Sequence, residues 1–246
     1  MTDQGRFAPR VWLALACLTD CPEVVPSWLG AGEREYLNGL THPKRRAFFL
    51  LGRTMLWQAL QTLSVAPGEL ELVRGAHGRP ELPLAGISFN LSGSKETVAL
   101  AVGMGCTVGL DVEDVSRSVD DALIVRRAMA DHDRRYIHGL ATHEQRAAFF
   151  EIWTLKEAYT KARGMGLKLG FGRFAFDLDV PGHIAWSMPP ADDQDIWQIQ
   201  TFADGHALQL ALCVACAGEA VPVDVPHGLI GTRHGMLMVP PGAAVE

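Results

Sequence analysis

The chain has 246 residues, of which 48% are hydrophobic and 20% are charged, so it can bury a substantial core as one large or two small domains. Its formal net charge of −6 argues against a general nucleic-acid binder. No apolar run is long enough to cross a membrane, and the run at residues 11–18 is too short for a signal peptide.

The five cysteines are an odd number, which favours reduced thiols and a cytoplasmic protein. Cys213 and Cys216 form a CxxC, but they lie in the apolar run LALCVACAG and lack a second pair at zinc-ligand spacing. We therefore expect a buried strand there instead of a metal site.

The first half of the chain predicts one strand, two helices and then four strands. Thr41 and Pro43 suit the start of the second helix, and the Gly- and Pro-rich segment GAHGRPELP is expected to be a loop. The expected elements are a strand at 11–18, helices at 26–40 and 43–63, and strands at 69–73, 87–91, 97–102 and 107–113.

The second half predicts short helices between residues 116 and 145, and then a long helix that Gly164 and Gly166 end. Past Gly218 the chain is rich in Pro and Gly, so we expect weak order or a strap over the surface. The other expected elements are the long helix within 149–167 and antiparallel strands at 173–178, 184–187, 197–202 and 208–215.

A basic stripe runs along the second helix, because Arg45, Arg46 and Arg53 recur at a spacing of seven or eight residues. A solvated stripe and a phosphate-binding row are about equally compatible with this spacing. Guanidinium groups suit the second role because their paired donors match phosphate oxygens.

Asp111 and Glu113 fall on one face of the strand at 107–113, where their charges repel each other. A hard cation such as Mg²⁺ would relieve this repulsion, whereas a strand end running into solvent is the simpler alternative. In the long helix, Trp153, Glu157 and Lys161 share one side at i, i+4 spacing. A surface Glu–Lys pair is the common outcome, and the metal site is favoured only once Glu157 joins the first two carboxylates.

These two segments, VGLDVED and WTLKEAYTKARGMGL, resemble the signature motifs of the 4′-phosphopantetheinyl transferases of the monomeric, surfactin-synthetase-activating (Sfp-like) type. KRRAFFLLGR resembles the basic helix of that family, HGRP its adenine-side loop and FNLSGS its turn at the 3′-phosphate, so the similarity spans about residues 44–176. The matching motif residues are Gly109, Asp111, Glu113, Trp153, Lys156, Glu157, Lys161, Gly164, Gly166 and Leu167.

The resemblance implies a Mg²⁺-dependent transfer of the phosphopantetheine arm of coenzyme A to a serine of an apo carrier protein, with release of adenosine 3′,5′-bisphosphate. Asp111, Glu113 and Glu157 would hold the metal, Glu157 would also act as the base, and Lys161 would hold the pyrophosphate. The positions expected to bind coenzyme A are Arg45, Arg53, Arg79, Ser92 and Lys161.

The resemblance also implies an α+β fold of two similar halves, each a long helix on a small, mainly antiparallel sheet, with the active site between them. The expected division is residues 1–105 for the coenzyme A side, 106–218 for the metal and catalytic helix, and a tail at 219–246. A monomer is expected. Carrier proteins of fatty acid, polyketide or nonribosomal peptide synthesis are candidate partners, docking near Arg126, Arg127, Arg134 and Arg135. A solvated basic patch is an equally good interpretation of any one of these arginines.

One position departs from the family pattern: where the family commonly has His after the serine of the 3′-phosphate turn, this chain has Gly93. A coenzyme A-binding regulator that lost transfer is therefore an alternative, although the intact carboxylates and Lys161 argue against it. A Mg²⁺-dependent pyrophosphate hydrolase would use the same carboxylates with water as nucleophile.

Overall fold

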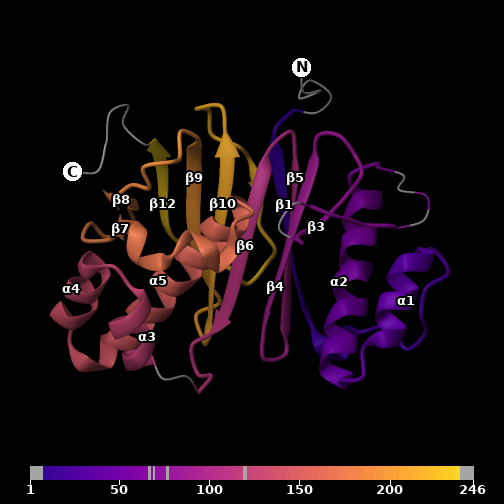
Figure 1. The fold of residues 1–246 in the computed structure, drawn as a ribbon, viewed down its shortest axis with the longest axis horizontal. Coiled ribbons are helices and arrows are strands. Elements are labelled where there is room, and N and C mark those ends of the chain that lie inside the picture. Colours follow the sequence, from indigo (N-terminus) through magenta and orange to yellow (C-terminus); the bar gives the residue numbers. More distant parts are fainter. Residues whose placement is uncertain (1–7, 66–67, 69, 76–77, 119–120, 239–246) are drawn as a thin grey trace.

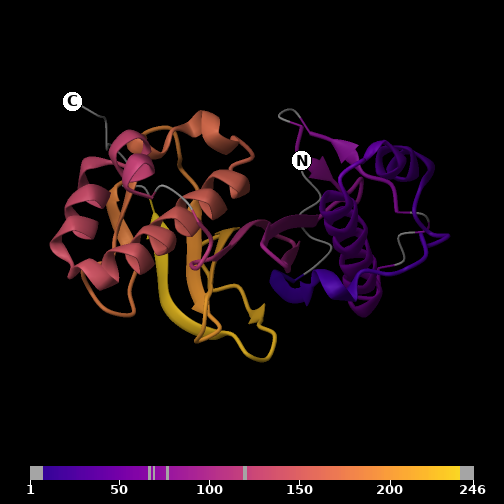
Figure 2. The ribbon, with the colours of Figure 1, turned by 90° about the horizontal axis from the view of Figure 1, so that it is seen from below.

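The structure is a computed structural model that describes residues 8–65, 68, 70–75, 78–118 and 121–238. Two four-stranded sheets lie side by side, and a long helix packs on each of them (Figure 1). Seen from below, the two sheet-and-helix halves meet at the strands in the centre of the molecule (Figure 2). The α+β fold class expected from the sequence is confirmed.

The first sheet has the strand order β11-β1-β5-β4 and packs against helix α2 (Pro43–Thr62). Leu56 and Leu60 of α2 bury their side chains against Val98 and Leu100 of the sheet, which removes apolar surface from water. The strands are β1 (Arg10–Cys17), β4 (Ile87–Ser94), β5 (Thr97–Met104) and β11 (Val223–Asp224), of which only β11 pairs in parallel. Around them lie η1 (Leu18–Asp20), α1 (Ala31–Gly39) and the hairpin of β2 (Val73–Arg74) and β3 (Pro80–Glu81).

The second sheet has the order β12-β9-β10-β6, and every neighbouring pair is antiparallel. Helix α5 (Thr142–Ala162) buries Phe149, Leu155 and Tyr159 in the core of this half. The strands are β6 (Thr107–Asp114), β9 (Ile196–Ala203), β10 (Leu208–Cys216) and β12 (Ile230–Met238). The remaining elements are α3 (Asp121–Ala128), α4 (Asp131–Gly139), η2 (Gly166–Leu169), η3 (Phe171–Arg173), β7 (Ala175–Asp177) and β8 (Ala185–Met188).

The two sheets are joined by polar side chains of β4 that bind the backbone of β6. The amide of Val108 donates to Ser88 Oγ at 3.2 Å, that of Leu110 to Asn90 Oδ1 at 2.9 Å, and that of Asp114 to Ser94 Oγ at 3.0 Å. These bonds satisfy edge-strand donors that would otherwise need another strand or water. The alternating polar residues of ISFNLSGS thus place β4 beside the carboxylates of β6.

Several boundaries differ from the sequence expectation. Helix α5 begins at Thr142, well before residue 149, and α1 covers only part of 26–40. The strand expected at 69–73 is present only from Val73, while Glu69 is outside the described residues. Past Gly218, where weak order or a surface strap was expected, β11 pairs with β1 and β12 pairs with β9, while residues 239–246 lie outside the described part of the chain.

Cys213 is fully buried within β10, which confirms the buried strand expected for the CxxC segment. All five cysteines are free thiols. Within the described ranges, no helix combines the length and the apolar character that crossing a bilayer requires.

Candidate active site

Strand β6 lies directly against the backbone of helix α5 at Gly109. A Cβ at this position would lie 2.1 Å from the carbonyl oxygen of Ala158 and 2.3 Å from the amide nitrogen of Ala162. Because both contacts are to backbone atoms, neither can move aside easily, and only glycine fits. This contact brings the carboxylates of β6 to the side of α5 that carries Glu157 and Lys161.

Asp111, Lys161 and Ser92 form one hydrogen-bonded group from β6, α5 and β4. Lys161 Nζ lies 2.6 Å from Asp111 Oδ1 and 2.9 Å from Ser92 Oγ, and Ser92 Oγ donates to the same Asp111 oxygen at 2.7 Å. The other carboxylate oxygen, Asp111 Oδ2, is buried, and none of the residues that the structure describes gives it a hydrogen bond. A buried acceptor without a partner is costly unless something binds it.

Glu113 lies two residues further along β6, where three donors hold its carboxylate. Ser94 Oγ donates to Oε2 at 2.8 Å, while Arg117 Nη2 and Trp153 Nε1 donate to Oε1 at 2.7 Å and 3.1 Å. Burial raises the pKa of Glu113 against the effect of the Ser94 hydrogen bond, and the charge of Asp111 raises it further.

Glu157 faces the same two carboxylates from helix α5. Burial raises the pKa of Glu157, the charge of Lys161 opposes this, and the charges of Asp111 and Glu113 add to it. The charges of Asp111 and Glu113 are therefore close enough to disfavour the ionisation of Glu157. Such like-charge clusters attract cations.

The three carboxylates of the site are the candidate metal ligands. Among the described residues, no group of three acidic, histidine or cysteine side chains is drawn together tightly enough to form a ready-made metal site. Cationic side chains bind two of the carboxylates instead, Lys161 on Asp111 and Arg117 on Glu113. The chemistry still fits a hard cation, because carboxylate oxygens are preferred Mg²⁺ ligands and Asp111 Oδ2 is an unused one.

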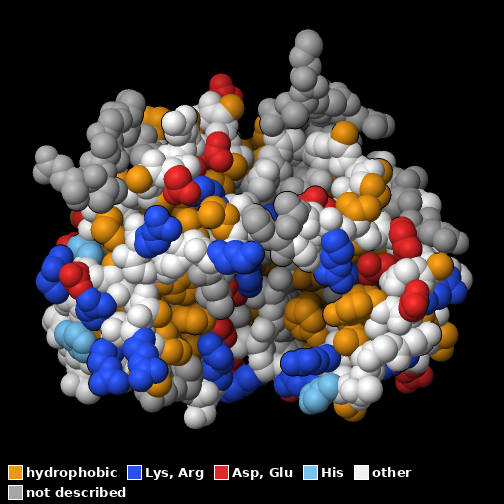
Figure 3. Space-filling model, in the orientation of Figure 1, with side chains coloured by type: hydrophobic (Ala, Val, Ile, Leu, Met, Phe, Trp, Pro, Cys, Tyr) orange, Lys and Arg blue, Asp and Glu red, His pale blue; other side chains and the backbone are white. Residues whose placement is uncertain are grey.

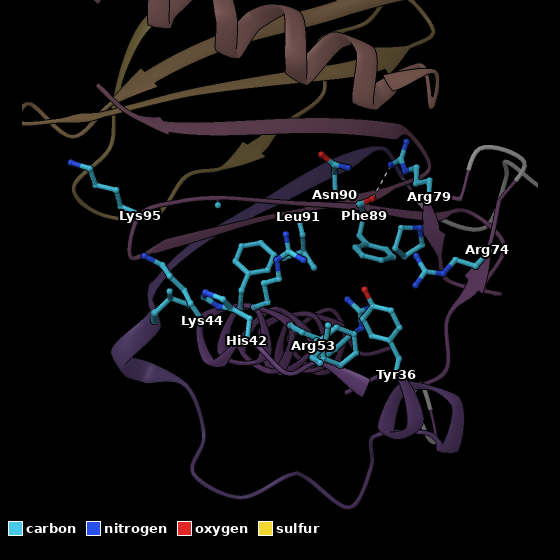
Figure 4. A pocket seen from close by; sticks show the side chains of 17 residues that line it. Tyr36, His42, Lys44, Arg53, Arg74, Arg79, Phe89, Asn90, Leu91 and Lys95 are labelled. Atoms are coloured by element: carbon cyan, nitrogen blue, oxygen red, sulfur yellow. Dashed lines mark hydrogen bonds between the residues drawn. The ribbon is translucent and has the colours of Figure 1, made fainter. Parts of the chain in front are cut away.

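A cavity of about 620 Å³ lies in the N-terminal half, between α2 and β4 (Figure 4). Its apolar wall includes Phe48, Phe49, Phe89 and Leu91. In the space-filling view, Lys and Arg side chains border an apolar hollow on the half that carries α2 (Figure 3). The cations that line the cavity are Lys44, Arg45, Arg53, Arg74, Arg79 and Lys95. A site of this kind suits an anionic ligand with an apolar or aromatic part.

The basic stripe of α2 does not act as one surface. Arg45 and Arg53 line the cavity, whereas Arg46 Nη1 donates to the carbonyl oxygen of Leu37 at 2.7 Å. Arg53 is buried in an ion pair with Glu33, and its guanidinium lies 4.4 Å from the centre of the Phe49 ring. Burial lowers the pKa of Arg53, and the hydrogen bond to Glu33 opposes that effect.

Four of the five residues expected to contact coenzyme A have partners within the protein: Arg53 and Lys161, as described above, and also Ser92 and Arg79. Ser92 binds Asp111 and Lys161, as described above, and is not part of the cavity lining. The guanidinium of Arg79 donates to backbone carbonyl oxygens of α5, β4 and β6. Gly93, in contrast, lines the cavity, and a Cβ there would lie only 2.1 Å from Cε2 of Phe48.

Several contacts in and around the site were not predicted from the sequence. Arg117 was not singled out, since its contact with Glu113 follows from the turn after β6 and not from a helical spacing. Lys156 of the second motif points away from the carboxylates and forms a fully buried ion pair with Asp133 at 2.6 Å. Ser94 stood in the quoted FNLSGS segment, and the alternation of polar residues there was the available signal.

The basic region expected to dock a carrier protein lies on the other half. Arg134 and Arg135 line a second cavity of about 480 Å³, and Arg134 also pairs with Asp131. Arg126 and Arg127 lie in the last turn of α3.

Comparison with known proteins identifies the family of this chain. Residues 107–213 match the family model described as the 4′-phosphopantetheinyl transferase superfamily. The 4′-phosphopantetheinyl transferase HetI of Nostoc sp. is 30% identical over 170 residues, which cover 65% of this chain and 72% of that protein. The 4′-phosphopantetheinyl transferase psf-1 of Bacillus pumilus is 28% identical over 178 residues, covering 72% of this chain and 74% of that protein. This chain therefore belongs to the 4′-phosphopantetheinyl transferase superfamily and is a transferase.

Proposed function

We propose that this transferase moves the 4′-phosphopantetheine arm of coenzyme A to a serine of an apo acyl or peptidyl carrier protein, with Mg²⁺ and with release of adenosine 3′,5′-bisphosphate. The observation that carries the proposal is the hydrogen-bonded group of Lys161, Asp111 and Ser92, in which Asp111 Oδ2 is buried and has no partner among the described residues. Strand β4, which carries Ser92, also contributes to the wall of a cavity that cations line. Residues 1–105 would supply the coenzyme A side and residues 106–218 the carboxylates and the catalytic helix.

In the proposed reaction, the serine oxygen bonds to the phosphorus that carries the pantetheine arm. The bond from that phosphorus to the bridging oxygen breaks, and the electron pair leaves with adenosine 3′,5′-bisphosphate. Glu157 takes the serine proton directly or through a water, and its raised pKa makes it a better base than an ordinary carboxylate. Lys161 stabilises the negative charge on the leaving phosphate.

Asp111, Glu113 and Glu157 are the residues that would hold the metal. When bound, Mg²⁺ would neutralise charge on the pyrophosphate. Lys161 is already hydrogen-bonded to Asp111, so its ammonium is close to the place where the pyrophosphate would have to lie. Arg45 and Arg53 would bind coenzyme A phosphates from the cavity wall.

The test is incubation of the protein with coenzyme A, Mg²⁺ and apo carrier proteins from fatty acid, polyketide and peptide synthesis, followed by mass spectrometry of each carrier. A mass gain of one phosphopantetheine arm, lost when Mg²⁺ is chelated, supports the proposal. Cleavage of coenzyme A without a carrier would identify a hydrolase. Coenzyme A binding without either reaction would identify a regulator that has lost transfer.

We further propose a changed tolerance for coenzymes that lack the 3′-phosphate, because Gly93 contributes no side chain to the cavity and the Phe48 ring fills the adjacent space. Comparable turnover with coenzyme A and 3′-dephospho-coenzyme A would support this proposal. A strong preference for coenzyme A would contradict it.

We also propose that the protein works as a cytoplasmic monomer that binds neither nucleic acid nor membranes. Light scattering after gel filtration measures the mass directly, and the expected value is that of one 26.7 kDa chain. A stable dimer would overturn the monomer.

A further inference from the structure

The guanidinium of Arg79 ties together the three elements that carry the site. Nη1 donates to the carbonyl oxygens of Lys161 and Ala162 at 2.8 Å and 3.4 Å, and Nη2 donates to those of Phe89 and Val108 at 2.8 Å and 2.9 Å. Figure 4 shows Arg79 at the edge of the cavity with its bond to Phe89 drawn as a dashed line. One side chain thus joins the end of α5 to β4 and β6.

The helix end is a place where a cation is favourable. The last carbonyl groups of an α-helix lack partners within the helix and carry partial negative charge. Arg79 supplies donors to the last two carbonyl oxygens of α5 from a segment 82 residues earlier in the chain than Lys161. It therefore caps the helix that carries Glu157 and Lys161 from the other half of the molecule.

The hydrogen bonds of Arg79 lie beside the close contact between β6 and α5. Arg79 binds Val108 and Ala162, and Gly109, next to Val108, leaves room for the backbone of that same Ala162. Lys161, whose carbonyl Arg79 holds, places its ammonium on Asp111 and Ser92. A shift of the helix end would therefore move Lys161 relative to both partners.

The same contacts leave Arg79 poorly suited to phosphate. A guanidinium has five N–H donors, and bidentate phosphate recognition needs two of them side by side. Four of the donors of Arg79 are directed at backbone carbonyl oxygens, which leaves only Nε–H. This differs from Arg45, which lines the cavity without such a commitment to the helix end.

We propose that Arg79 is a positioning residue, which fixes the C-terminal end of α5 against β4 and β6 and so places Lys161 for transfer, and is not a phosphate ligand. This proposal rests on the proposed function. Loss of the Arg79 side chain should therefore lower the rate of the chemical step and leave the affinity for coenzyme A unchanged.

The test compares kcat and KM for coenzyme A in Arg79→Met, Arg79→Lys and Arg45→Met. Misplacing a catalytic group by about 1 Å can cost on the order of 10²-fold in rate. Arg79→Met is expected to lower kcat by about 10- to 100-fold with KM nearly unchanged, and Arg79→Lys is expected to recover part of the loss. Arg45→Met is expected to raise KM instead.

A matched control is Arg233→Met. Arg233 Nη1 also donates to backbone carbonyl oxygens, those of Leu178, Val180 and His183. Arg233 belongs to strand β12, however, and its acceptors do not belong to α5, β4 or β6. We expect this change to lower the melting temperature and to leave kcat unaltered. A similar loss of kcat in both variants would mean that Arg79 is only structural.

The remaining outcomes are equally decisive. A rise in KM of tenfold or more with normal kcat in Arg79→Met would make Arg79 a phosphate ligand and overturn the proposal. If that variant does not fold, Arg79→Lys provides the same split between kcat and KM. A wild-type protein that loads no carrier would overturn the proposed function and this inference together, whereas an active wild type with a KM effect overturns only the inference.

Discussion

Lys161 and Asp111 form an ion pair in which Nζ lies 2.6 Å from Oδ1, although 50 residues separate them in the chain. The pair links the last turn of α5 to the middle of β6, and Ser92 of β4 binds both partners. A small helical displacement would separate them. The residues that hold α5, β6 and β4 against one another therefore control the position of Lys161.

Glu157→Gln removes the proposed proton acceptor while keeping the size of the side chain. Loss of a general base typically lowers the rate by about 10²- to 10⁴-fold, so carrier loading measured by mass spectrometry should fall by that factor. Coenzyme A binding measured by calorimetry without Mg²⁺ should change little. Glu151→Gln is a control on the same helix, because Glu151 pairs with Arg233 and not with the site. Full activity of Glu157→Gln would exclude Glu157 as the base.

Gly109→Ala is expected to push α5 away from β6. The added methyl group would meet backbone atoms of Ala158 and Ala162 at 2.1 Å and 2.3 Å. Overpacking of this kind typically costs about 1–3 kcal/mol, so urea unfolding should show lower stability and transfer should be lost. Gly139→Ala is the control, since its Cβ would meet no atom within 4 Å. Equal stability of the two variants would contradict the close approach.

Lys156→Met is expected to destabilise the fold strongly. It leaves the buried carboxylate of Asp133 without its ion-pair partner, and breaking such a pair typically costs about 3–5 kcal/mol. The double change Lys156→Met with Asp133→Asn should recover part of this loss. Urea unfolding of the single and double variants measures both values. A single-variant cost below about 1 kcal/mol would show that the pair matters little.

The same variant should be sensitive to pH. Burial already raises the pKa of Asp133, and removing Lys156 takes away the charge that lowers it. The folded variant would therefore hold a proton on Asp133 that the unfolded chain releases near pH 3.9. The contribution of Asp133 to the stability of the variant should be fully present below that pH and should be lost as the pH rises through the raised pKa. A cost of Lys156→Met that is equal at acidic and neutral pH would contradict this account.

Gly93→Ala is expected to disturb the cavity wall. Its Cβ would lie 2.1 Å from Cε2 of Phe48, so the ring would have to turn into the cavity. We expect KM for coenzyme A to rise and stability to fall by about 1–3 kcal/mol. Adding Phe48→Leu should relieve the clash and restore part of both. Unchanged KM and stability in Gly93→Ala would show that the ring adjusts without cost.

The sequence predicted the elements whose apolar periodicity is strong. The long helices over α2 and α5 and the strands β6 and β10 follow directly from it. The alternation of β6 also put Asp111 and Glu113 on one face, and the structure has both accepting hydrogen bonds from serines of β4. The start of α5 was missed because its first turns read THEQRA, with polar residues and no buried apolar side chain.

What the sequence could not predict depends on distant partners. Arg45 and Arg46 are neighbours, yet only the position of α1 decides that Arg46 binds the carbonyl of Leu37 while Arg45 lines the cavity. The role of Arg79 likewise depends on the end of α5 arriving beside it. Strand β12 was missed because its composition is unlike a core strand, and pairing with β9 stabilises it instead.

The C-terminal segment contributes a strand to each sheet, β11 beside β1 and β12 beside β9. Val11 of β1 pairs with Val223 of β11. During synthesis, this edge of β1 therefore has no partner strand until residue 223 has been added. The amino-terminal half would therefore leave the ribosome with an unpaired edge on β1. Nascent chains halted before residue 223 should be more easily digested by protease around β1 than the released protein.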